Sequence, residues 1–153
     1  MKTSNHREIT NIICEYFNIK KEDLFSKTRK REVVVIRQLN YYMIRKFTNL
    51  SLQEIGNQTT GAEYNFKQDH STIIHSINTV SGLRRFDKEV ELKCVSIESL
   101  INVFIKTGDI EFIKVILIKK IKNAGNINDL IKLSEGQKTL IENIKLKENE
   151  SKS

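Results

Sequence analysis

The most informative segment of this chain for its fold is Asp69-His70-Ser71-Thr72-Ile73-Ile74-His75. It opens a predicted helix with short polar side chains and then becomes apolar. The apolar residues that anchor the later turns are Ile73, Ile74, Ile77, Val80 and Leu83. In the second helix of a helix-turn-helix, the first turn meets base edges in the major groove and the remaining turns hold the helix on the core. The pattern therefore predicts a recognition helix over 69–86 and indicates DNA binding.

The segment upstream carries the start of another helix. Ser51 is a predicted N-cap and Glu54 completes a capping box with it, while Leu50 and Ile55 are placed to form a hydrophobic staple. A helix over 52–58 followed by the recognition helix supplies the two helices of the motif.

Residues 59–68 lie between these two helices and form an insertion, because such helices are normally joined by roughly 3–4 residues. Two aromatic residues in the insertion, Tyr64 and Phe66, either pack against the core or touch the DNA backbone.

The remainder of the chain also predicts helices, and no segment shows the alternation of a strand. The sequence contains no proline, so long helices are not interrupted. We expect helices over 5–16 and 32–47, a helical turn over 21–25 and a basic loop over 26–31. Apolar spacing predicts a helix over 97–106. The next predicted helix is capped by Asp109 and is apolar on most of its faces from Phe112 to Ile121. Two more helices are predicted over 126–133 and 135–147.

The predicted fold class is therefore all-α, with a Trp-repressor-like helix-turn-helix domain followed by a helical extension. The expected domains are 1–90 for the helix-turn-helix domain and 91–153 for the extension. Packing of sequential helices within one chain is the usual outcome, so we expect helices 97–106 and 135–147 to cover the apolar one between them. The alternative is that residues 91–150 form a homodimer or bind a protein partner, since a large apolar surface is rarely left exposed.

Composition and charge favour a nucleic-acid partner. The chain of 153 residues is 39% hydrophobic and 29% charged, without an apolar run that would cross a membrane or a signal peptide, so we expect a cytoplasmic, nucleoid-associated protein. Its net charge is +7, and residues 1–50 contribute most of it, with eleven Lys or Arg against five Asp or Glu. Such a local basic surplus is typical of a surface that contacts phosphates. In the C-terminal third, lysines are interpreted as an ordinary solvated surface.

Catalytic and metal-binding interpretations find little support. Cys14 and Cys94 are single residues among apolar neighbours and lack a C-x-x-C partner, so both are expected in the core. His70 and His75 are five positions apart, a rotation of roughly 140° on a helix, so their rings do not converge on a metal ion. Neither a phosphate-binding G-x-x-x-x-G-K-[ST] loop nor a nucleophile–base arrangement is present in the sequence. We expect no enzyme, no cofactor and no metal.

Several motifs, in order, resemble the C-terminal DNA-binding domain (domain IV) of the bacterial replication initiator DnaA. The recognition segment, with Ser76, is similar to that family's D-H-T-T-V-L-H-A. Upstream, the family's basic loop resembles Ser26-Lys27-Thr28-Arg29-Lys30-Arg31 of this chain. The family's L-T-N-x-S-L-x-E-I-G motif resembles Phe47-Thr48-Asn49-Leu50-Ser51-Leu52-Gln53-Glu54-Ile55-Gly56. The resemblance covers roughly residues 5–88 and implies a copy of this domain without the initiator's ATPase module.

The resemblance also implies roles for individual residues. Arg29 would enter the minor groove, where a guanidinium reads groove width and negative potential. Base or groove contacts are expected from Arg29, Arg37, Asp69, His70, Ser71 and His75. Phosphate contacts are expected from Lys27, Lys30, Arg31, Gln38, Arg45, Ser51 and Thr72.

Three of these positions have a further property or a second interpretation. Asp69 is also a natural N-cap. Ser71 stands where the family has threonine and lacks the methyl group that contacts thymine. For His75 the alternative is a core histidine with a satisfied hydrogen bond.

The function predicted from the sequence is sequence-preferring binding of double-stranded DNA, at a target akin to the initiator's short AT-containing box. A replication accessory and a regulator both fit this prediction. The alternative is a protein-interaction or oligomerisation module, or a transcriptional regulator, that uses the C-terminal helices.

Overall fold

The computed structural model describes residues 6–58, 64, 66–109, 111 and 113–114, and every regular element among them is an α-helix. The helices are α1 (His6–Phe17), α2 (Lys21–Leu24), α3 (Arg31–Phe47), α4 (Leu52–Gln58), α6 (His70–Phe86) and α7 (Lys88–Thr107). The all-α prediction is confirmed, and the first five helices begin and end within one residue of the expected ranges. None of the helices in the described part is long and apolar enough to cross a bilayer.

Helix α7 is longer than the helix 97–106 that the spacing of apolar residues predicted: it begins at Lys88. Asp87 caps its N-terminus: Oδ1 accepts hydrogen bonds from the backbone N–H groups of Glu89 at 3.0 Å and Val90 at 3.2 Å. Gly108, in the left-handed conformation at φ 66°, ends it. The expected helices 126–133 and 135–147, and most of the one from Phe112 to Ile121, lie outside the described residues.

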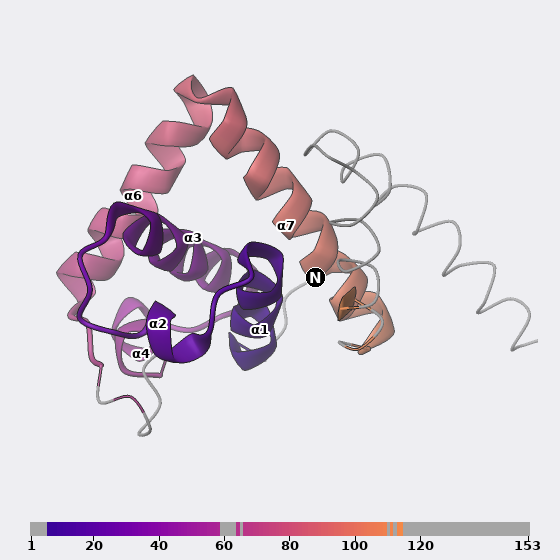
Figure 1. Ribbon diagram of the computed structural model, residues 1–153, viewed down its shortest axis with the longest axis horizontal. Coiled ribbons are helices and arrows are strands. Elements are labelled where there is room, and N and C mark those ends of the chain that lie inside the picture. Colours follow the sequence, from indigo (N-terminus) through magenta and orange to yellow (C-terminus); the bar gives the residue numbers. More distant parts are fainter. Residues whose placement is uncertain (1–5, 59–63, 65, 110, 112, 115–153) are drawn as a thin grey trace, which may run out of the picture.

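The main core is one cluster to which α1, α3, α4, α6 and α7 all contribute buried residues. Figure 1 shows α6 and α7 as a V-shaped pair, with α3 and α1 between its arms. Tyr41 and Met43 of α3, Ile12 of α1, Ile73 of α6 and Ile101 of α7 all belong to this cluster and are at most 1% exposed. Helix α7 therefore shares its core with helices of the first 90 residues. The division into domains 1–90 and 91–153 stays a prediction.

A smaller cluster lies beneath α2. It consists of Cys14, Leu24, Phe25 and Phe66, all buried. The insertion thus sends Phe66 into the protein, and Tyr64 packs beside it with its ring centroid 5.8 Å from that of Phe25. Of the two interpretations of these aromatic residues, packing against the core is the one that the structure confirms. Both cysteines are buried and free, as expected.

Candidate nucleic-acid interface

The first turn of α6 is capped as the sequence predicted. Oδ1 of Asp69 accepts a hydrogen bond from the backbone N–H of Thr72 at 2.8 Å. This hydrogen bond lowers the pKa of the Asp69 carboxyl, so the carboxylate is ionised at neutral pH and stays an acceptor. One of its oxygens is engaged by the cap, and the side chain is exposed to solvent.

The exposed side of α6 carries most of the predicted base-reading residues. His70, Ser71 and His75 are all exposed, whereas Thr72 is half-buried. The exposure of His75 excludes its interpretation as a core residue. In the part of the chain that the structure describes, no three His, Cys, Asp or Glu side chains form a group that would hold a metal ion.

Ile74 and Leu83 were expected to anchor the helix, and for both residues that expectation is wrong, since Leu83 is also exposed, at 37%. Ile73 is fully buried, whereas Ile74 is 39% exposed. Adjacent helical residues point about 100° apart, so one packed face cannot bury both. Ile74 lies instead on the same side as His70 and His75, where its side chain is available for apolar contacts. The rotation of about 100° between adjacent helical residues is the sequence signal that predicts the exposure of Ile74.

Helix α4 holds the start of α6 through backbone contacts. Its capping box is formed: the Ser51 N–H donates to Oε2 of Glu54 at 2.7 Å, and the Glu54 N–H donates to Oγ of Ser51 at 3.2 Å. At its other end the Gly56 carbonyl accepts a hydrogen bond from the Gln68 N–H at 3.2 Å. A Cβ atom at Gly56 would lie 2.1 Å from the Gln68 oxygen, so only glycine allows this approach.

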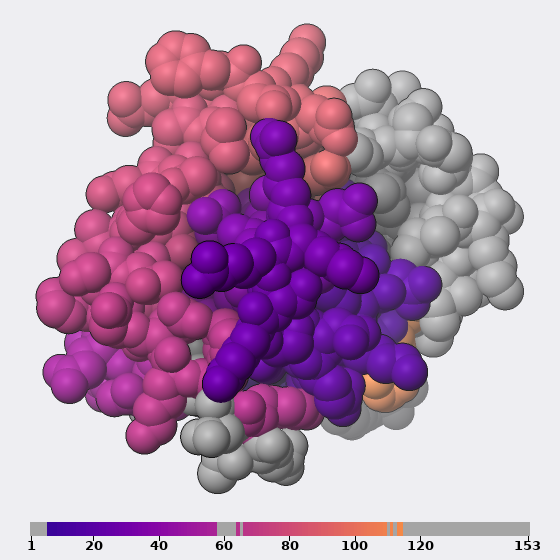
Figure 2. Space-filling view, turned by 60° about the vertical axis from the view of Figure 1, so that its left-hand side comes forward, coloured from indigo at the N-terminus to yellow at the C-terminus, as the bar shows by residue number. Residues whose placement is uncertain are grey.

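The basic loop presents its charges to solvent. The side chains of Lys27, Arg29, Lys30 and Arg31 are all exposed. Figure 2 shows long side chains of the purple segment, which contains this loop, projecting on the same face as the magenta segment that contains α4 and the start of α6. The structure thus brings the predicted loop and the predicted recognition turn to one surface.

Arg37 was predicted to contact a groove, but the structure places it inside the protein. It is 9% exposed, and its Nε and Nη2 donate hydrogen bonds of 2.8 Å to the carbonyls of Leu24 and Ser26. Its guanidinium also lies over the Phe66 ring, 4.8 Å from the centroid. One hydrogen bond engages Leu24, at the end of α2, and the other engages Ser26, the first residue of the basic loop, so Arg37 holds the start of that loop in place.

The predicted phosphate-contacting residues of α3 and α4 differ in their surroundings. Arg45 is exposed and its Nη1 donates to the Leu50 carbonyl at 2.7 Å, at the junction of the two helices. Gln38 is half-buried, and Ser51 is exposed with its hydroxyl oxygen engaged in the capping box.

Comparison with known proteins gives the family. The family described as bacterial dnaA protein helix-turn-helix matches residues 6–80. These residues belong to the DnaA helix-turn-helix family.

Relatives of this DnaA-type domain are chromosomal replication initiator proteins named DnaA. The protein of Bacteroides thetaiotaomicron is 32% identical over 94 residues, which are 61% of this chain and 19% of the relative. That of Thermus thermophilus is 38% identical over 84 residues, 55% of this chain and 18% of the relative. That of Crocosphaera subtropica is 32% identical over 101 residues, 66% and 21% respectively. The chain spans about a fifth of the length of the curated relatives that it matches.

A charged cluster at the C-terminal end of α6 fixes that end of the helix, and no sequence pattern indicated this cluster. It joins Arg84, Glu91 and Glu98, which follow the matched range, to Tyr42 and Lys46 within it. Nε of Arg84 donates to Glu91 at 2.6 Å, and Nη1 donates to the Tyr42 hydroxyl at 3.0 Å and to Glu98. Lys46 pairs with the same Glu98 at 2.7 Å. These contacts join α3, α6 and α7, and the hydrogen bond to Glu91 raises the pKa of Arg84 further above its ordinary value.

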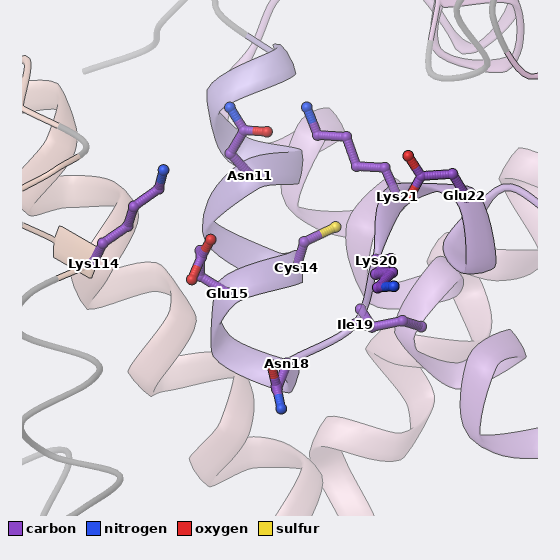
Figure 3. A pocket seen from close by; sticks show the side chains of 9 residues that line it. All are labelled: Asn11, Cys14, Glu15, Asn18, Ile19, Lys20, Lys21, Glu22 and Lys114. Carbon is purple, nitrogen blue, oxygen red and sulfur yellow. The ribbon is translucent and has the colours of Figure 1, made fainter.

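A pocket of about 580 Å³ lies between α1 and α2, near Lys114. Its lining side chains diverge rather than meet at one point, as Figure 3 shows for Asn11, Asn18 and Lys21. Cys14 also lines it, but burial raises the pKa of that thiol to about 11, so it is protonated and unreactive at neutral pH. The pocket has no part in the interface described above.

Proposed function

We propose that this chain binds double-stranded DNA with sequence preference, as the DnaA-type domain of an origin-box-binding protein would. The exposed N-terminal end of α6, with the N-cap Asp69, His70 and Ser71 of the first turn and His75 of the second, enters the major groove. Arg29 enters the adjacent minor groove, and Lys27, Lys30 and Arg31 neutralise phosphates beside it. The observation that carries the proposal is that the polar turn and the basic loop are exposed on one face.

The remaining predicted residues take supporting roles in this proposal. Arg45 and Ser51 lie near the junction of α3 and α4, Gln38 lies within α3, and Thr72 lies in the first turn of α6. In this proposal their polar groups reach phosphates on either side of the groove. Arg37 positions the basic loop instead of touching DNA. The proposed target is a short AT-containing box, and the proposed setting is the nucleoid in the cytoplasm, in replication or in its regulation.

Base reading by His70 is the first test. The imidazole of His70 is exposed at the leading edge of α6, so the substitution His70→Ala should weaken binding to the preferred duplex by about 1–3 kcal/mol. Binding to a scrambled duplex should hardly change, because phosphate contacts remain. Fluorescence anisotropy with both duplexes measures the difference. His6→Ala, at the start of α1, is the control, because no DNA contact is proposed for His6, and it should leave both affinities unchanged. Equal losses of His70→Ala on both duplexes would contradict base reading.

Phosphate neutralisation by Lys27 is the second test. Lys27 is an exposed ammonium in the basic loop, so Lys27→Ala should weaken all duplexes similarly. The slope of log affinity against log salt should fall by about one unit, as expected when one phosphate contact is lost. Lys88→Ala removes another exposed lysine, at the start of α7, and should keep the original slope. Identical slopes for the two variants would remove the loop from the interface.

A further inference from the structure

We propose that Phe66 is a positioning residue that ties the leading turn of α6 to the basic loop through Arg37. By this tie it would fix the separation between the major-groove and minor-groove contacts, a consequence that rests on the proposed function. Phe66 belongs to the insertion, and the sequence predicted for it only packing against the core or contact with the DNA backbone, not a link between α6 and the loop.

The Phe66 ring is held firmly within the smaller cluster. It is 7% exposed and packs with Leu24 and Phe25, whose ring centroid is 6.4 Å away. Its face lies 4.8 Å from the guanidinium carbon of Arg37. A cation over an aromatic face is attracted by the negative potential of the ring, and more strongly where water is excluded.

Arg37 passes this constraint to the loop. Its two hydrogen bonds end on the carbonyls of Leu24 and Ser26, immediately before Lys27. Burial lowers the pKa of Arg37, a sign that its charge has been removed from water and depends on these carbonyls and on the ring. Without the ring, the guanidinium would lose one of its three fixed contacts.

Only a short segment connects Phe66 to the start of α6. Phe66 precedes the N-cap Asp69 by three residues, and between them the Gln68 N–H is bonded to Gly56 of α4. The segment from Phe66 to Asp69 is therefore anchored at both ends, and movement of the ring would move the start of α6. Protein elements that read neighbouring grooves must match the spacing of those grooves along the duplex.

Two variants and one control test whether the contact between Phe66 and Arg37 connects α6 to the basic loop. Phe66→Leu keeps an apolar side chain in the cluster but removes the aromatic face. Arg37→Lys keeps the charge but cannot donate to both carbonyls in the same planar geometry. Cys14→Ala reduces the volume of the same cluster, and Cys14 makes neither the ring contact nor the two hydrogen bonds. Thermal unfolding of the full chain verifies that all of them are folded at the assay temperature.

The first readout needs no DNA. Limited digestion of the full chain with trypsin, followed by mass spectrometry, measures cleavage after Lys27 and Arg29. We expect about three- to tenfold faster cleavage at these bonds in Phe66→Leu and Arg37→Lys, the factor that a lost cation–π contact or hydrogen bond would give. Cys14→Ala should be cleaved at the wild-type rate. Wild-type rates in both test variants would overturn the proposal.

The second readout uses duplexes in which the AT-rich segment is displaced from the rest of the box by one base pair. Wild type should bind the displaced duplex at least about tenfold more weakly, and Phe66→Leu should show a smaller ratio between the two duplexes. An unchanged ratio would overturn the role in spacing. If wild type binds box, displaced and scrambled duplexes alike, the proposed function fails, whereas the cleavage rates still decide whether Phe66 holds the loop.

Discussion

A chain that ends at Glu91 is expected to lose its cooperative thermal unfolding transition and to aggregate. The cut removes the buried residues of α7, which are Cys94, Ser96, Ile97, Leu100, Ile101, Val103 and Phe104. Full burial of one large apolar side chain contributes about 1.5–3 kcal/mol, and a typical domain has a free energy of unfolding of about 5–15 kcal/mol. The lost burial is therefore at least as large as the stability of a typical domain, so we expect the remaining helices not to fold cooperatively. Circular dichroism during heating and light scattering measure both effects.

Single substitutions in the full chain provide a graded control for the shortened chain. Ile101 is fully buried, so Ile101→Ala should lower the free energy of unfolding by about 2–5 kcal/mol. Ile105, four residues later on the same helix, is only half-buried, and Ile105→Ala should have a smaller effect. A chain ending at Glu91 that melts cooperatively at the wild-type temperature would show that residues 1–90 fold independently, as the predicted domain division allows.

The substitution Gly56→Ala is expected to disrupt the helix-turn-helix itself. The new methyl group would lie 2.1 Å from the Gln68 oxygen and 3.1 Å from the Gln68 carbonyl carbon, both backbone atoms that cannot rotate away. Helices α4 and α6 must then separate, and the hydrogen bond from Gln68 to Gly56 is lost. We expect the free energy of unfolding to fall by about 1–3 kcal/mol or more, as in overpacked cores, with loss of preference for the box duplex. Urea denaturation and anisotropy measure the two changes.

Gly82→Ala is the matched control for this substitution. Gly82 lies within α6, and a Cβ atom there would meet no atom within 4 Å. Replacement of a helical glycine with alanine should raise the free energy of unfolding by roughly 0.5–1 kcal/mol, because the unfolded chain loses conformational freedom. If the two variants had equal stability, the close approach at Gly56 would not constrain the helices.

The local features of the fold were predictable from sequence. The capping box of Ser51 and Glu54 and the N-cap at Asp69 join atoms only three residues apart. Such contacts form wherever the correct residues stand at the correct spacing, whatever the remainder of the chain does. The exposed basic loop followed similarly from a run of charged residues, which are rarely buried without partners.

The roles of the arginines were decided by the tertiary structure. In the sequence Arg37 and Arg29 are both basic residues near the expected interface, yet one is buried and the other is exposed. The difference arises because α2 places the carbonyls of Leu24 and Ser26, and the insertion places Phe66, around the Arg37 guanidinium. These partners are 11 to 29 positions away in the chain, so no local pattern reveals them.

Helices α6 and α7 show the same contrast between features set by local sequence and features set by tertiary contacts. The residue pattern predicts α6 as a helix with a polar first turn and an apolar face in its later turns. The folded chain, by contrast, places Arg84 against Tyr42, 42 positions earlier, and against Glu98, and encloses α7 in the core of the DnaA-type domain. Helix formation depends on contacts between neighbouring turns, whereas the orientation of one helix on another depends on side chains that meet only when the chain has folded.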